Sequence, residues 1–289
     1  MLKSALRALA PALFLAAAPL LTACGQANMN INGEDGVPLA ELDMTREVPS
    51  KIVLAGPDTV VVTRGEKLAI TIDGDGTAKD ELRFSLKNGT LGIMRKSQGG
   101  WTDASSTVRV TMPNPQSAVV AGSGTLELPG MAQNAGIVIA GSGTATVKTL
   151  SARQLSVTVG GAGKLVASGT AETLELTIAG SGEADMRGLQ VDRAEVTIAG
   201  SGNAAFASDG RVEATIVGSG TVDVAGNATC TIKAMGSGSL NCSGGTRTKT
   251  GEAPAAPAAP DAPNAPRGPD TPSSPTSPDA PAPPTPSEN

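Results

Sequence analysis

The side chains of this chain that could do chemistry are thiols and carboxylates, because its 289 residues include 3 Cys and 27 Asp and Glu but no His and no Tyr. Asp185 and Asp223 take the same place in two units of a repeated pattern, with Ala205 in the unit between them. At one strand spacing per unit the two acids would lie about 9.6 Å apart, close to the separation used in glycoside hydrolysis. No long insertion interrupts the units to wall a cleft, so we treat this pairing as a coincidence and expect no catalytic residues.

A second set of acids, Glu175, Glu195 and Glu213, recurs at one place in three successive units. Like charges stacked at roughly the 4.8 Å strand spacing repel one another unless something neutralises them. Arg193 and Arg211 each precede one of these glutamates by two residues and could screen the column. The alternative is an acidic stripe that collects divalent cations or a cationic polymer. The ligand aspartates of calcium-binding Gly-Gly-x-Gly-x-Asp repeats are missing, so we expect no metal and no cofactor.

Two of the three cysteines, Cys230 and Cys242, flank the last unit and fall on inward positions by strand alternation. In an exported protein two such thiols often pair, because that compartment is oxidising. A bridge would lock the terminal unit. Disulfide geometry needs Cβ atoms about 3.8 Å apart, which spacing along the chain does not establish, so two buried free thiols remain the alternative.

The third cysteine, Cys24, follows an N-terminal segment typical of bacterial export signals. Lys3 and Arg7 precede a short apolar stretch, which ends in Leu21-Thr22-Ala23-Cys24. This ending resembles the lipobox of bacterial lipoproteins, in which cleavage leaves the cysteine as the first mature residue and lipid is attached to its sulfur. We therefore predict a signal peptide over residues 1–23, a lipid anchor at Cys24 and a tether over residues 24–45. By the same resemblance, Gly25 favours sorting to the outer membrane, on a face that the sequence does not specify.

The chain that positions these groups returns seven times to a corner of small residues. First glycines of successive corners are 19, 20, 19, 20, 18 and 18 residues apart. Such a period predicts a solenoid with one coil per repeat. The corners are Gly122-Ser123-Gly124, Gly141-Ser142-Gly143, Gly161-Ala162-Gly163, Gly180-Ser181-Gly182, Gly200-Ser201-Gly202, Gly218-Ser219-Gly220 and Gly236-Ser237-Gly238.

Aliphatic residues alternate with polar ones on both sides of each corner. Because strand side chains alternate between two faces, equivalent aliphatic residues should stack into interior columns. One predicted column contains Ile139, Val159, Ile178, Ile198, Ile216 and Ala234, and another contains Leu126, Ala145, Leu165, Ala184, Ala204, Val222 and Leu240. Outward positions should carry a threonine ladder of Thr158, Thr177, Thr197 and Thr215.

Residues 46–115 are also predicted to be β structure, forming an N-terminal cap or the first irregular coils before the solenoid of residues 116–246. The strands expected there are 51–55, 59–63, 67–72, 82–86, 90–94 and 107–112. Asn88-Gly89 predicts a hairpin turn. Asp73-Gly74-Asp75-Gly76 lacks the later ligands of an EF-hand and is expected to be a turn. Trp101, in a glycine-rich loop, is either packed on the cap or exposed as a contact.

The C-terminal residues 247–289 form a separate, proline-rich tail. Every third residue from Pro254 to Pro281 is proline, which matches the three residues per turn of polyproline II. The remaining residues cannot form a core. We predict a disordered or polyproline II segment that acts as a spacer or as a ligand for a groove that reads such helices.

The region from about Val48 to Cys242 resembles the bacterial head GIN domain family, whose members are described as autotransporter adhesins by analogy with other β-helices. The resemblance rests on repeats of the form Val-x-Ile-x-Gly-Ser-Gly-x-Ala-x-Val behind a β-rich lead, on the turn at Asn88-Gly89-Thr90-Leu91 and on the closing run from Met235 to Gly245. It implies an all-β, right-handed parallel β-helix at the cell envelope.

These observations predict a non-enzymatic envelope lipoprotein whose solenoid surface serves adhesion or scaffolding. The net charge of −5 and the absence of a basic stripe argue against nucleic acid as a partner. The expected partners are the membrane, through the lipid anchor, and envelope polymers or surface glycans. The alternatives are a periplasmic structural or stress protein that bridges membrane and wall, and a polysaccharide-active β-helix enzyme.

Overall fold

The computed structural model describes residues 31, 36–45, 47–74, 76–96 and 105–249. The predicted signal peptide, Cys24, most of the tether, Trp101 and residues 250–289 of the proline-rich tail lie outside the described residues. Residues 247–249, which the sequence division assigned to that tail, form a β-strand instead. Among those described, all regular structure except two short helices is β. The helices are a 3-10 helix η1 (Leu39–Glu41) and an α-helix α1 (Gly76–Glu81).

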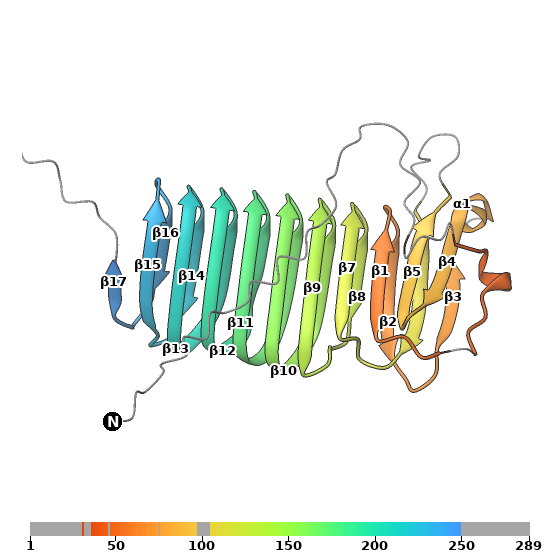
Figure 1. Cartoon of the computed structure of the whole chain (residues 1–289), viewed down its shortest axis with the longest axis horizontal. Coiled ribbons are helices and arrows are strands. Elements are labelled where there is room, and N and C mark those ends of the chain that lie inside the picture. The colour runs from red at the N-terminus through yellow and green to blue at the C-terminus, as the bar shows by residue number, and fades with distance from the viewer. Residues whose placement is uncertain (1–30, 32–35, 46, 75, 97–104, 250–289) are drawn as a thin grey trace, which may run out of the picture. The chain divides into compact units, whose positions relative to one another are not determined.

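The strands of the described residues form a single 17-stranded sheet that winds into a parallel β-helix (Figure 1). They are β1 (Lys51–Ala55), β2 (Thr59–Arg64), β3 (Ala69–Asp73), β4 (Leu82–Lys87), β5 (Thr90–Arg95), β6 (Thr107–Met112), β7 (Ser117–Gly122), β8 (Thr125–Leu128), β9 (Asn134–Gly141), β10 (Thr144–Gly161), β11 (Lys164–Gly180), β12 (Glu183–Gly200), β13 (Asn203–Gly218), β14 (Thr221–Ala225), β15 (Thr229–Met235), β16 (Ser239–Cys242) and β17 (Arg247–Lys249).

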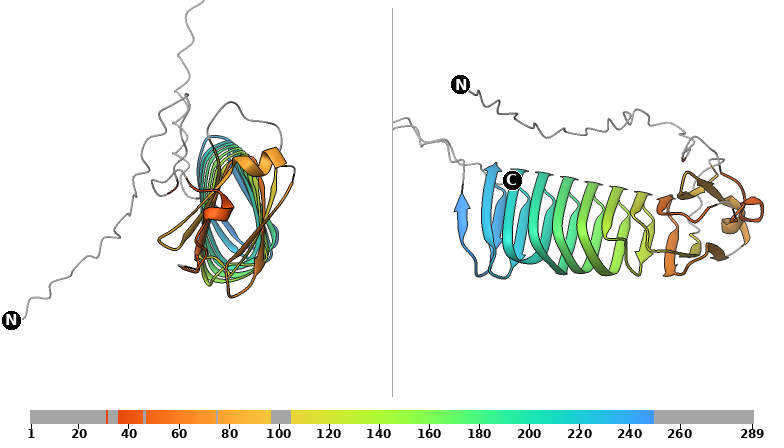
Figure 2. Two further views of the ribbon diagram at one scale, coloured as in Figure 1. Left: turned by 90° about the vertical axis from the view of Figure 1, so that its right-hand side faces the viewer. Right: turned by 60° about the horizontal axis from the view of Figure 1, so that its bottom comes forward.

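Each coil consists of two sheet faces joined by two turns, as the end-on view shows (Figure 2). The incoming face is made of the segments that lead into a glycine corner, for example β9. The outgoing face is made of the segments that leave it, for example residues 144–147 of β10. A return turn, residues 148–153 in the same coil, carries the chain back to the next incoming segment. β10 to β13 each contain an outgoing segment, a return turn and an incoming segment.

The coils stack in parallel register, and the repeat therefore places like residues on one another. Val159 pairs with Ile178, Ile178 with Ile198, and Ile198 with Ile216. These side chains are at most 1% exposed, and the outgoing column from Leu126 to Leu240 is equally closed to solvent. The predicted interior columns are confirmed. Burial of one aliphatic group contributes about 1.5–3 kcal/mol, so the columns together form the continuous core that a solenoid needs.

The six strands predicted between residues 51 and 112 are all present, but the chain does not visit the coils in spatial order. On the incoming face the order is β4, β5, β1, β7, β9, and on the outgoing face it is β3, β6, β2, β8, β10. The coil made by β1 and β2 therefore lies between a later coil, β5 with β6, and the coil β7 with β8. Residues 51–64 form a regular coil of the helix, whereas the sequence division allowed either an N-terminal cap or the first irregular coils here.

The N-terminal end is closed by antiparallel additions. β4 pairs with β5 through the predicted Asn88-Gly89 turn, whose φ angles are 52° and 68°, and β3 pairs with β6. The segment expected to be a turn at residues 73–76 leads instead into α1, a helix that the sequence pattern does not predict. Residues 36–45, which the sequence division assigned to the tether, belong to the folded unit: Leu39, Leu42 and Met44 pack against the core.

Candidate binding surface

Cys230 and Cys242 meet inside the last coil. Cys230 comes from β15 on the incoming face and Cys242 from β16 on the outgoing face, and they are joined as a disulfide with Cα atoms 6.7 Å apart. Cys230 is fully buried and pairs with Val212 of the preceding coil, while Cys242 pairs with Val224. The bridge thus spans the interior at the C-terminal end, where the described chain adds only strand β17 beside Cys230 and no complete further coil. Its role is to hold this end closed.

The glutamate column lies on the incoming face, in register. Glu175 pairs with Glu195 and Glu195 pairs with Glu213, and all three are exposed. Arg193 and Arg211 also stack on each other, yet within the described chain no Lys or Arg nitrogen lies within 4.0 Å of these three carboxylates. The two arginines thus make no direct ion pair with these glutamates, although each lies on the same face two residues before one of them. Solvent reaches all of these groups and weakens their repulsion.

The threonine ladder runs beside the glutamates on the incoming face. Thr158 pairs with Thr177, Thr177 with Thr197, and Thr197 with Thr215. The next outward column toward the glycine corner carries only small or apolar side chains: Ala140, Gly160, Ala179, Ala199, Val217 and Met235. Short side chains at strand spacing make this strip low from Thr158 to Thr215, beside the longer glutamates and arginines of the same face.

The predicted acid pair lies on the outgoing face and borders a shallow hollow of about 310 Å³. Asp185 and Asp223 are the register partners of Ala205 on the two neighbouring strands, and the short side chain of Ala205 forms the floor of the hollow. Both acids already have partners: Asn241 donates to Asp223 at 2.8 Å, and Arg187 lies 3.7 Å from Asp185. The structure brings the two acids to one hollow, but each is engaged by a neighbour on its own side.

A second hollow, which the sequence analysis did not find, runs along the return turns of three coils and encloses about 410 Å³. We call it the return-turn groove. Its rim carries exposed polar side chains, and its floor contains Ala152 and Ala171, which are 6% and 3% exposed. The rim residues are Gln133, Ser151, Arg153, Thr170, Glu172, Gln190 and Asp192. One sequence pattern could have indicated this groove. A small residue followed by a charged one recurs at Ala152-Arg153 and at Ala171-Glu172.

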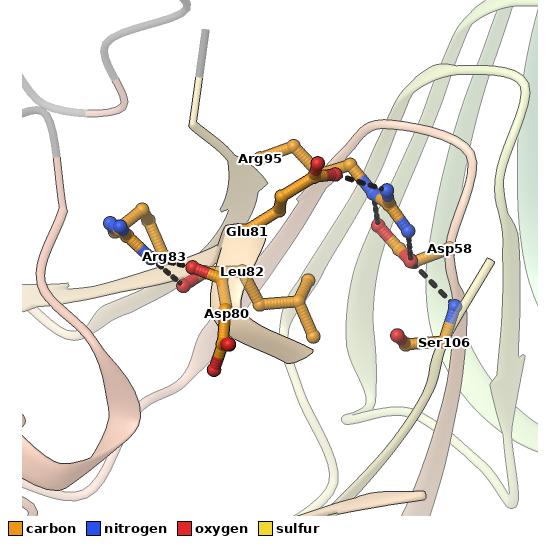
Figure 3. Close-up of polar contacts among 7 residues, drawn as sticks. All are labelled: Asp58, Asp80, Glu81, Leu82, Arg83, Arg95 and Ser106. Atoms are coloured by element: carbon orange, nitrogen blue, oxygen red, sulfur yellow. Dashed lines mark hydrogen bonds and ion pairs between the residues drawn. The ribbon is translucent and has the colours of Figure 1, made fainter. Parts of the chain in front are cut away.

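A buried ion pair closes the corner of the β1–β2 coil (Figure 3). Arg95 donates from Nε and Nη2 to the two carboxylate oxygens of Asp58 at 2.8 and 2.7 Å, and from Nη1 to Glu81 at 2.9 Å. The backbone N–H of Ser106 adds a bond of 2.8 Å to Asp58. The Asp58 and Arg95 side chains are 1% and 6% exposed. The hydrogen bond to Asp58 is the main reason why the pKa of Arg95 is raised above its usual value, and the guanidinium stays charged.

Asp58 takes the place of the third corner glycine in later coils, because its carbonyl accepts the N–H of Thr125 as Gly124 accepts that of Thr144. Arg95, at the end of β5, reaches Asp58 from the next coil outward. The network is a structural substitute for a stacked corner and offers no group to a substrate.

The described residues contain no group of three or more His, Cys, Asp or Glu side chains placed to hold a metal ion. None of their helices has the length and apolar character that crossing a membrane requires.

Comparison with solved structures finds the same fold in several bacterial proteins. A protein from Bacteroides fragilis described as a "putative adhesin" matches with a TM-score of 0.63 at 20% identity, over 68% of this chain and 93% of that chain. Two proteins of Parabacteroides distasonis, described as a "putative lipid binding protein" and a "putative adhesin", match with TM-scores of 0.54 at 23% and 17% identity, over the same shares. At these identities the likeness establishes the fold.

No protein with a curated description matches the chain. A family model, "Putative auto-transporter adhesin, head GIN domain", matches residues 49–228, which is more than half of the 289 residues. The matched region includes the β1–β2 coil, the closing strands of the N-terminal end and six of the seven glycine corners. The protein is a member of the head GIN domain family.

Proposed function

We propose that this protein is a non-enzymatic lipoprotein of the cell envelope, anchored through Cys24, whose β-helix serves as an adhesive surface. The observation that carries the proposal is the low strip of the incoming face, where threonine and small side chains stay in register from Thr158 to Thr215. Such a face offers contact area that repeats at the strand spacing, about 4.8 Å. Polymers and repetitive surfaces match a repeating face better than small molecules do.

The rigid core supports this role. Interior columns close-packed from β1 to β16 hold each outward side chain at a fixed position, so little conformational entropy is lost on contact. The described surface includes few large aromatic anchors of the kind that dominate tight protein–protein interfaces. Adhesion by this protein would therefore depend on many weak contacts, repeated over many anchored copies.

Two experiments test this function: protease treatment of intact cells and an attachment assay with a deletion strain. Antibodies against the β-helix should detect fragments released from intact cells, and a deletion strain should attach less to surfaces coated with envelope polymers or glycans. Re-expression of the full chain should restore attachment. Release only after lysis, with attachment unchanged by the deletion, would instead favour the periplasmic structural role.

A further inference from the structure

The return-turn groove has the features of a subsite for a polymer strand. Its long direction follows the helix axis across β10, β11 and β12, so successive coils contribute equivalent groups. Ser151 pairs with Thr170, and Thr170 pairs with Gln190. Each coil therefore adds one hydroxyl or amide at intervals of about 4.8 Å, a spacing comparable to the length of one sugar residue.

The groove owes its depth to irregularities in the return turns. The register between β10 and β11 shifts between Val147 and Leu150, and that between β11 and β12 shifts after Val166. Gly169, at φ +125°, makes the turn, and an added Cβ would lie 2.1 Å from the Leu150 carbonyl oxygen. With Ala152 and Ala171 beneath, the rim side chains stand above a low floor. The hollow is thus a consequence of the backbone path.

The charged groups of the rim have hydrogen-bonding capacity that the protein does not use. Arg153 lies beside Glu172, and Glu172 lies beside Asp192 on the next coil, yet none of the three makes an ion pair or side-chain hydrogen bond with another described residue. At the C-terminal end of the groove Gln190 donates to Asp209 at 3.0 Å, which holds its amide in place. By contrast, the acids of the hollow on the outgoing face already have partners.

We propose that the return-turn groove binds one strand of an uncharged, hydroxyl-rich polysaccharide lying along the helix axis. The proposal rests on the adhesive function proposed above and names its ligand class. Planar Arg, Gln, Glu and Asp groups can each hold two sugar hydroxyls, donating or accepting as required. Glu172 and Asp192 would repel a polyanion, and Arg153 would repel a polycation. The charges of the groove therefore do not favour either kind of charged polymer.

Calorimetric titration of the full mature chain tests the proposal with four probes. These are hexasaccharides of glucose and of N-acetylglucosamine, which are uncharged, of galacturonic acid, which is anionic, and of glucosamine, which is cationic. We expect at least one uncharged probe to bind with an affinity that changes little between low and high salt. Exclusive binding of a charged probe, lost at high salt, would overturn the proposal.

Matched variants locate the binding. Thr170→Leu fills the groove and removes a hydroxyl, and Arg153→Ala removes a charged donor; each should weaken binding about tenfold or more. Thr71→Leu and Arg64→Ala make the same changes at exposed positions of the outgoing face, outside both the groove and the incoming face, and should bind like the parent. Circular dichroism verifies that all four remain folded. Equal loss in the outgoing-face variants would move the site out of the groove.

The assignment of the groove and the adhesive function can fail separately. If no probe binds but the protein is released from intact cells and the deletion strain attaches poorly, the groove assignment is wrong and adhesion stands. If an uncharged probe binds through Thr170 and Arg153 while attachment is unchanged by deletion, the groove is real and adhesion is not its use.

Discussion

The sharpest prediction concerns two glycines that lie two coils apart, the corner residue Gly200 and Gly160 beside the corner at Gly161, which should respond in opposite ways to the same substitution. Gly200 has φ +128°, and a Cβ added to it would lie 2.3 Å from the carbonyl oxygen of Gly180 in the preceding coil. Gly160 lies on the incoming face with no positive φ, and its added Cβ would be 3.8 Å from the nearest atom. Its register partner in the next coil, Ala179, already is an alanine.

The expected magnitudes follow from these contacts. Gly200→Ala places a side chain in a backbone region that costs about 1–3 kcal/mol, and forcing the two coils apart costs roughly another 1–3 kcal/mol. The total is roughly 2–6 kcal/mol, a large part of the typical 5–15 kcal/mol stability of a domain. Gly160→Ala should instead stabilise the protein by about 0.4–1 kcal/mol, because alanine restricts the unfolded chain.

Urea unfolding followed by far-ultraviolet circular dichroism measures both effects. The midpoint should fall clearly for Gly200→Ala and rise slightly for Gly160→Ala. Hydrogen exchange should show faster opening of the coil around residues 193–207 in the first variant, since solenoid stability depends on contacts between neighbouring coils. Equal midpoints for the two variants would refute the reasoning, because they would mean that successive corners are not in backbone contact.

Three further outcomes are expected. Asp58→Ala should lower stability by about 3–5 kcal/mol, because it removes the carboxylate that accepts two hydrogen bonds from the buried Arg95 guanidinium; adding Arg95→Met should recover part of this loss in thermal melts, and no recovery would mean that the pair is not coupled. Cys230→Ser with Cys242→Ser should cost about 3 kcal/mol for a loop of 12 residues; unchanged melting of the parent after reduction would contradict it. Cys24→Ser should move the protein from the membrane to the soluble fraction of cells, and continued membrane association would exclude the lipid anchor.

Alternation and repetition made most of the solenoid predictable from sequence. The period of 18 to 20 residues and the aliphatic positions beside each corner identified the interior columns, because a coil that repeats must stack like on like. Strand boundaries in the first hundred residues were equally clear, because Gly, Pro and Asn-Gly separate short runs of β-branched residues. The helix α1 escaped prediction because six residues without apolar periodicity carry no helical signal.

The candidate site was predictable only in part. Register from the repeat correctly placed Asp185 beside Ala205 and Glu175 beside Glu195. It did not reveal that Asn241 and Arg187 engage the acids of the hollow, or that Arg193 and Arg211 make no ion pairs with the glutamates. Side-chain rotamers decide such contacts, and a one-dimensional pattern does not contain them. The return-turn groove depends on register shifts within the turns. Counting residues per repeat does not reveal these shifts, because it treats all return turns as equal.

The sequence by itself determined that the chain winds into stacked coils, which residues point inward and where the corners lie, because local alternation and a constant period are sufficient for these features. Only the tertiary structure decided that residues 51–64 are inserted between two coils formed by later segments. A parallel strand pairs with whichever strand edge is free when the two come together. The same short β-branched strand can therefore pair on either of its two sides. Asp58, Arg95 and the antiparallel closure by β3 and β4 select one arrangement, and those contacts join residues that are far apart in the chain.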